Sequence, residues 1–142
     1  MDLLRISVPD LDLPDLYLKT EVFIEEGGDL VSARESSLVR SRVVHVITAW
    51  NPGEARPTRE ENEKANSELQ VRLRVEGLHP VRALGADPDS NHSEESWAVV
   101  GLSDNRARAL GAEFGQVAVF RLADGAQTVL ACFENWECSR AL

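Results

Sequence analysis

"SRVVHVITAWNP", Ser41 to Pro52, is a buried strand that ends in a tryptophan, an asparagine and a proline. Its apolar residues are nearly continuous from Val43 to Trp50, as in a strand that is covered on both faces. Pro52 has no N–H for a strand ladder, so the strand ends there. Asparagine before proline is a turn former, but a large aromatic and an amide at the end of a core strand would also suit a binding site. The sequence is compatible with both interpretations of Trp50 and Asn51.

The chain on either side of this strand alternates between strand and helix patterns. Residues 26–37 are rich in Gly and Ser and indicate a loop. A capping box, Thr58 to Glu61, begins a helix that Gly77 ends. Ser103 caps a second helix that Gly115 ends. The predicted strands are residues 16–26, 41–50, 78–84, 96–102, 116–122 and 127–133, and the predicted helices are 58–76 and 103–114.

Without the first and last strands, the order is β-α-β-β-α-β, which is the split β-α-β or ferredoxin-like arrangement. The predicted class is therefore α+β, with two helices on one face of a single antiparallel-rich sheet. One extra strand is expected at each end of this core. The strands at 41–50 and 96–102 are expected to be central neighbours, because both are almost wholly apolar. Pro80 places the strand at 78–84 at a sheet edge.

Length and charge limit the class of protein. The 142 residues, 43% of them hydrophobic, predict a single domain over 1–142. Its core is expected at 17–133, with an N-terminal arm, 1–16, and a C-terminal tail, 134–142. The net charge of −9 disfavours direct binding to nucleic acid. No apolar run is long enough to cross a membrane, and no signal peptide is recognisable, so the predicted location is cytoplasmic.

Strand direction brings the unusual polar residues to one end of the predicted sheet, which we call the rim. The strand that ends at Trp50 and Asn51 would run antiparallel to the one that begins at Ser96. The N-terminus of the first helix, with its inward-facing Asn62 and Asn66, lies at the same end. The residues expected there are Trp50, Asn51, Asn62, Asn66, Asp87, Asp89, His92, Glu94, Glu95, Ser96, Trp97 and Gln116.

Four segments, "ITAWNP", "ENEKANSEL", "EESWAVVGLS" and "FGQVAVF", resemble recurring segments of an uncharacterised bacterial family, domain-of-unknown-function family 3293. The resemblance runs from Tyr17 to Phe120 in the same order. It implies a shared domain and a shared site but no activity. The matching positions are Thr48, Trp50, Asn51, Pro52, Asn62, Asn66, Glu95, Ser96, Phe114, Gly115 and Gln116.

Metal and cofactor motifs are weak. Asp87, Asp89 and Asn91 match the first three ligand positions of a calcium loop, but His92 and Ala98 occupy the glycine and glutamate positions. No phosphate loop of recognised spacing is present. Two cysteines, Cys132 and Cys138, cannot build a four-ligand zinc site. We therefore expect no metal and no cofactor.

Catalytic motifs are also sparse. Glu95 and Ser96 are adjacent in a strand and point to opposite faces, so they do not form an acid–base and nucleophile pair. His45 lies inside an apolar strand and is expected to be a core histidine. Glu95 alone, held by Gln116 and Asn51, is the candidate general acid or base.

Three functions are compatible with these residues. The first is a non-catalytic module that binds an unknown small polar ligand or a protein partner at the rim, because amides and tryptophans outnumber paired acid–base groups there. The second is an enzyme that uses Glu95, and the third is an acidic inhibitor or accessory factor. The predicted ligand-binding residues are Thr48, Trp50, Asn51, Asn62, Asn66, Glu95, Ser96, Trp97 and Gln116.

Overall fold

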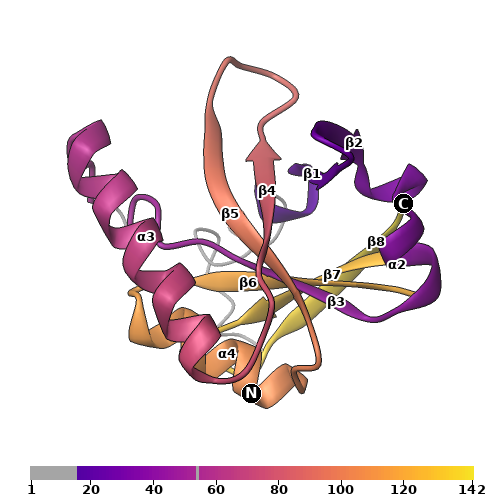
Figure 1. Ribbon diagram of the computed structural model, residues 1–142. Helices are drawn as coiled ribbons and strands as arrows, with labels where there is room; N and C mark the ends of the chain where they lie inside the picture. The colour runs from indigo at the N-terminus through magenta and orange to yellow at the C-terminus, as the bar shows by residue number, and fades with distance from the viewer. Residues whose placement is uncertain (1–15, 54) are drawn as a thin grey trace.

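A computed structural model of the chain describes residues 16–53 and 55–142, and shows one antiparallel sheet of eight strands with four helices (Figure 1). The strands are β1 (Glu21–Glu26), β2 (Asp29–Ser32), β3 (Val44–Ile47), β4 (Val81–Ala86), β5 (Ser93–Val100), β6 (Ala118–Ala123), β7 (Ala126–Ala131) and β8 (Glu137–Ala141). The helices are the 3-10 helix η1 (Ala33–Glu35), α2 (Ser37–Ser41), α3 (Arg59–Val75) and α4 (Asp104–Glu113). The predicted α+β class and single antiparallel sheet are confirmed.

The strand order in the sheet is β2-β1-β4-β5-β3-β6-β7-β8. As predicted, β3 and β5 are central neighbours, with Val46 opposite Ala98 and Ile47 opposite Trp97. The prediction that β4 lies at an edge is wrong, because β4 pairs with β1 as well as β5. Pro80 precedes the first paired residue of β4, so its missing N–H removes no ladder bond.

The sheet has two added strands on each side of the predicted core, not one. Residues 29–32, expected in a loop, form β2 and pair with β1. At the other side, residues 137–141 of the predicted tail form β8 and pair with β7. Residues 16–18, expected to begin the first strand, form a helical turn instead. The two unexpected strands, β2 and β8, have a common cause, since short strands at a sheet margin have little apolar alternation of their own.

Two hydrophobic cores lie on opposite faces of the sheet. On one face, Leu69 and Leu73 of α3 and Leu110 of α4 pack on Ile47 and Val99. On the other face, Val44 and Val46 pack with Ala98, Leu122 and residues of η1 and α2. Alternate residues of β3 and β5 thus enter different cores, which is why these strands are almost wholly apolar. Both long helices lie on one face, as predicted.

The sheet curls on the face opposite α3 and α4. In Figure 1 the β4–β5 hairpin stands across the direction of β6 and β7. The curl brings β7 and β8 to the chain just before β1, where Gln127 Nε2 and Arg140 Nη2 donate to Thr20 O at 2.9 and 3.1 Å. The rings of Tyr17 and Phe120 meet edge to face, 6.4 Å between centroids. The face inside the curl is therefore concave.

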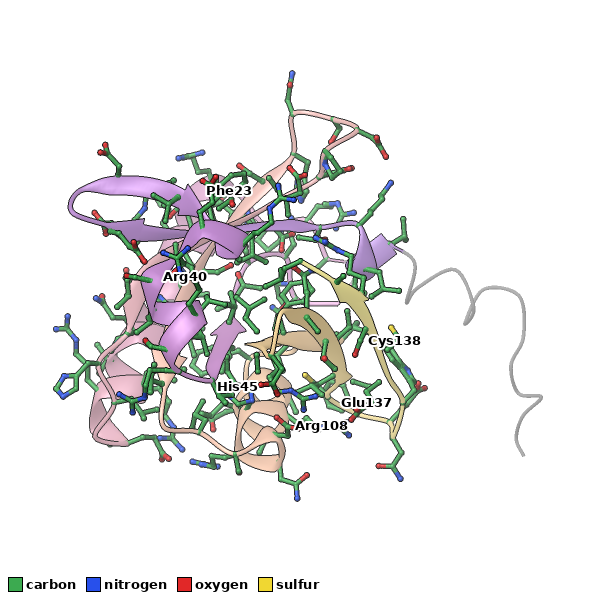
Figure 2. All side chains as sticks on the ribbon, turned by 90° about the vertical axis from the view of Figure 1, so that its right-hand side faces the viewer. Phe23, Arg40, His45, Arg108, Glu137 and Cys138 are labelled. Carbon is green, nitrogen blue, oxygen red and sulfur yellow. The ribbon has the colours of Figure 1, made fainter. Side chains whose placement is uncertain are left out.

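Polar contacts join α4 to the sheet. His45 is 1% exposed, and its Nε2 lies 2.8 Å from Asp104 Oδ1 at the start of α4, so the expected core histidine is confirmed. Arg121 of β6 pairs with the other oxygen of Asp104. Further along α4, Arg108 Nη2 lies 3.2 Å from a Glu137 oxygen in β8, and Figure 2 shows this pair beside Cys138. No helix of the described chain has the length and apolarity that crossing a bilayer requires.

Candidate functional site

The segment that follows β3, residues 48–53, which we call the tethered segment, is held in place by hydrogen bonds from two other parts of the chain and by one within itself. Buried amide side chains of α3 and of the turn before β6 make most of these bonds, so the segment is fixed rather than loosely packed. The bonds are Ala49 N to Asn66 Oδ1 (3.3 Å), Trp50 N to Thr48 Oγ1 (3.0 Å), Gln116 Nε2 to Trp50 O (3.2 Å), Asn51 N to Asn62 Oδ1 (2.9 Å) and Gly53 N to Gly115 O (2.9 Å).

The sequence of α3 explains this arrangement. The capping box of Thr58 and Glu61 begins the helix, so that Asn62 and Asn66 lie one turn apart on its inner side. Both amides are buried, with 3% and 6% of their surface exposed. Gly115, whose carbonyl oxygen accepts the hydrogen bond from Gly53 N, has φ +74, and a Cβ there would lie 2.9 Å from Pro52 Cβ. Only glycine therefore allows this approach without displacement.

Asn51 has the most constrained conformation in the segment. Its φ of 47° lies in the left-handed region, which Asn visits more readily than other residues with a Cβ but which only Gly adopts freely. Its side chain and backbone bond reciprocally with Asn62, since Asn62 Nδ2 also donates to Asn51 Oδ1 at 2.9 Å. The remaining donor, Asn51 Nδ2, points to Glu94 Oε2 at 3.3 Å. The fold thus holds Asn51 in a strained state that presents its amide to a carboxylate.

Glu94 and Asn51 border a cavity of about 270 Å³ on the concave face of the sheet, which we call the concave cavity. Its floor comes from β3, β5 and β6, its walls from the chain before β1 and from the segment after β3, and its mouth from the β4–β5 connection. It is lined by Leu16, Tyr17, Lys19, Thr20, Val46, Thr48, Asn51, Gly53, Arg56, Gly85, Ala86, Asp87, His92, Glu94, Ser96, Gln116, Ala118 and Phe120.

The charged groups of the cavity are of both signs. Glu94 is 29% exposed and also receives a contact from His92 Nε2 at 3.1 Å. Lys19 is paired at the mouth with Asp89, 3.1 Å away, and with Asp87, 3.8 Å away. Burial raises the pKa of the Tyr17 phenol, and the nearby Glu94 charge raises it further. Tyr17 therefore stays protonated and neutral near pH 7.

A second, shallower depression lies on the other face of the same strands, beside α3, and we call it the tryptophan groove. Its residues are Trp50, Arg59, Glu63, Asn66, Ser67, Arg82, Glu95 and Trp97. The Arg59 guanidinium lies over the Trp50 ring, 6.0 Å from its centroid. The Trp97 indole N–H donates to Asn66 O at 2.8 Å. A ligand that stacks on Trp50 would have to displace Arg59.

The nine predicted ligand-binding residues fall on both faces of the sheet. Four line the concave cavity (Thr48, Asn51, Ser96 and Gln116), four line the tryptophan groove (Trp50, Asn66, Glu95 and Trp97), and Asn62 bonds to Asn51 between them. The split follows from the two-residue period of β5, because Glu94 and Ser96 point to one face and Glu95 and Trp97 to the other. The structure brings these residues to one end of the sheet, but not to one site.

Glu95 pairs with Arg82 through two bonds, 3.0 and 3.1 Å long. Asn51 and Gln116, which were expected to hold Glu95, line the other face of the sheet. The carboxylate beside Asn51 is Glu94, which the sequence placed at the rim but not among the ligand-binding residues.

Two cavity residues had no sequence signal. Tyr17 reaches the cavity only through the curl of the sheet, and Arg56 belongs to a proline-bounded turn that predicts no direction for its side chain. The sequence did contain a signal for Glu94, because the two-residue period of a strand places its side chain on the same face as that of Ser96.

The calcium-like loop is explained by local bonds. Asp87 Oδ1 accepts from Asp89 N at 2.9 Å, and Asp87 Oδ2 accepts from Ser90 Oγ at 3.1 Å, so the loop is an Asx turn. Throughout residues 16–53 and 55–142, no three His, Cys, Asp or Glu side chains are grouped so that they could hold a metal ion.

A family model described as a protein of unknown function, DUF3293, matches residues 47–119. The match begins in β3, ends in β6 and contains α3, β4, β5 and α4, so it includes the tethered segment and the Asn and Gln residues that hold it. It leaves out Tyr17 and the β1–β2 hairpin, which the sequence resemblance had included. No curated protein and no solved structure matches the chain.

Proposed function

Since the chain belongs to the DUF3293 family of proteins of unknown function, its own geometry has to carry the functional argument, and we propose that it is a non-catalytic module that binds a small polar ligand in the concave cavity. The observation that carries this proposal is the strained Asn51, fixed by Asn62 with its amide directed into the cavity. Strained residues that the surrounding fold holds in place cluster at functional sites.

The size and lining of the cavity support a small ligand. About 270 Å³ is near the lower end of the range for small-molecule sites. Val46, Ala118 and Phe120 supply apolar surface, while Asn51 and Glu94 supply polar groups. More than half of the lining residues are polar or charged, which suits a small polar ligand better than an apolar one.

The second candidate function is an enzyme with a glutamate as general acid or base. The sequence candidate, Glu95, is bound by Arg82 through both oxygens, on the face of the sheet away from the concave cavity. Glu94, in contact with His92, is the carboxylate of the concave cavity. We place the enzyme second because, among the described residues, Asn51, His92 and Arg82 bond to these two carboxylates, and no serine, threonine, cysteine or lysine does.

A thermal-shift screen of small polar metabolites would test the binding proposal. A ligand at a hundred times its Kd adds about 2.7 kcal/mol to the free energy of unfolding. The unfolding entropy is about 0.3 kcal/mol/K for 142 residues, so the melting temperature should rise by about 9 °C.

Two variants and a control locate the binding. Asn51→Gly relieves the left-handed strain and removes the amide, and Glu94→Gln removes the charge, so both should reduce the shift. Glu68→Gln, on the exposed side of α3 away from both depressions, should leave it unchanged. A complete metabolite screen without any shift would refute the proposal, as would equal shifts in all three variants.

We also propose that the segment from β3 to β6 is a ferredoxin-like core and that the protein is cytoplasmic. The first of these is supported by its chain order, β3-α3-β4-β5-α4-β6, and by the order of its strands in the sheet, β4-β5-β3-β6. A binding partner on the acidic surface is the alternative occupant of the rim, and it would show as a salt-dependent interaction.

A further inference from the structure

The charges of the concave cavity point to a particular class of ligand, and this inference rests on the proposed function. Both contacts that Glu94 makes, from Asn51 Nδ2 and His92 Nε2, are to its Oε2 atom. Within the described chain Oε1 accepts no hydrogen bond, although the side chain is only 29% exposed. A partly buried carboxylate oxygen without a donor is suited to a ligand that carries an ammonium group.

Arg56, on the loop that follows the tethered segment, provides the opposite charge. Among the described residues, its one hydrogen bond runs from Nη1 to Ala55 O, at 3.1 Å. No described carboxylate pairs with it. The planar guanidinium has five donors and binds carboxylates through two parallel bonds. Arg56 lines the same cavity as Glu94 but comes from a different wall.

Several other polar groups of the cavity already have partners within the described chain. Lys19 is neutralised by Asp87 and Asp89 at the mouth. The hydroxyls of Thr48 and Ser96 donate to backbone carbonyls of β5, at 2.7 and 3.2 Å. Among the described lining residues, Glu94 Oε1 and the Arg56 guanidinium are therefore the charged groups left for a ligand.

The volume sets the ligand size. About 270 Å³ corresponds to roughly nine water volumes of about 30 Å³ each, which is space for about ten non-hydrogen atoms. We propose that the concave cavity binds a free α-amino acid as its zwitterion, with the ammonium group at Glu94, the carboxylate at Arg56 and the side chain against Val46, Ala118 and Phe120.

Isothermal titration with the twenty L-α-amino acids would test this proposal. At least one should bind, and its N-acetyl and carboxamide derivatives, which each lack one charge, should bind at least about tenfold more weakly. In Glu94→Gln, the free and the N-acetyl forms should bind equally. In Arg56→Gln, the free acid and the carboxamide should bind equally.

The variants Glu68→Gln and Arg74→Gln, both exposed on α3, are the matched controls and should keep the full discrimination. The zwitterion proposal would be overturned if no amino acid binds while another metabolite shifts the melting temperature, and in that case the proposed function stands. Discrimination that survives in Glu94→Gln and Arg56→Gln would also overturn it. If neither amino acids nor the wider metabolite panel bind, both proposals fail.

Discussion

Replacing Asn62 with alanine measures how strongly the fold holds the segment after β3. The change removes two hydrogen bonds, from Asn51 N and to Asn51 Oδ1, each 2.9 Å long. Each contributes about 1 kcal/mol, and the Asn51 N–H is left without its acceptor, which costs about 1 kcal/mol more. Alanine offsets about 0.6 kcal/mol through its higher helix propensity. The expected loss in the free energy of unfolding is therefore about 2 kcal/mol.

Urea unfolding, followed by circular dichroism and tryptophan fluorescence, would measure this loss. In a separate thermal unfolding experiment, an unfolding entropy of about 0.3 kcal/mol/K converts this loss into a decrease in melting temperature of about 7 °C. Glu68→Ala, an exposed substitution on the same helix, should change stability by less than about 0.5 kcal/mol. Because Asn51→Ala removes one of the same two bonds, the one from Asn62 Nδ2 to Asn51 Oδ1, the double variant should be less destabilised than the sum of the single ones.

If Asn62→Ala were as stable as the Glu68→Ala control, the amide pair would not hold Asn51 in its left-handed state. Strict additivity in the double variant would have the same meaning. Either result would remove the observation on which the proposed function rests.

Three further predictions concern the frame around the site. Gly115→Ala should lower the free energy of unfolding by roughly 1–2 kcal/mol because of its positive φ, and by more because the new Cβ would contact Pro52. Gly77→Ala, with φ +87 and open space around it, is the control in urea unfolding and should show only the loss that the positive φ causes. Burial lowers the pKa of His45, although its carboxylate partner opposes this effect, so the contribution of neutral His45 to stability is complete above the unfolded pKa of about 6.5 and is lost as the pH falls towards the folded pKa. Between pH 7.5 and 5.5 the melting temperature should therefore decrease less in His45→Gln than in the native chain. An equal decrease in melting temperature would contradict the assignment. Burial raises the pKa of Cys132 to about 12, so iodoacetamide at pH 8 should modify this thiol, as mapped by mass spectrometry, only after denaturation; rapid labelling of the folded protein would show that the thiol is accessible.

The central part of the fold could be predicted from the sequence because each element there has a strong local signal. The apolar run that contains β3 enters two cores through Val46 and Ile47, so burial on both faces was visible in its composition. The capping box at Thr58 fixed the start of α3 to within one residue. The position of β4 could not be predicted, because it depends on pairing with β1, about sixty residues earlier, and such non-local pairing leaves no local pattern.

The gathering of polar residues at one end of the sheet could be predicted, but not the face of the sheet to which each of them points. Strand direction correctly brought Asn51, Ser96 and Gln116 together. The sequence did not show which face of the sheet curls, so residues of both faces were assigned to one cleft. The buried amides were expected to meet a ligand, but Asn62 and Asn66 instead bond to the backbone of the chain after β3. Their burial is a tertiary property, which spacing along a helix does not distinguish from exposure to a ligand.

The adjacent glutamates of β5, Glu94 and Glu95, limit which sequence changes the concave cavity can tolerate. If β5 slipped by one residue against its neighbours, Glu95 would replace Glu94, and the bulky indole of Trp97 would replace the small hydroxyl of Ser96. Acidity inside the curl would survive such an error, but the space for a guest molecule would not. Variation or engineering of ligand preference should therefore proceed by exchanging side chains at fixed register, and not by insertion or deletion within this strand.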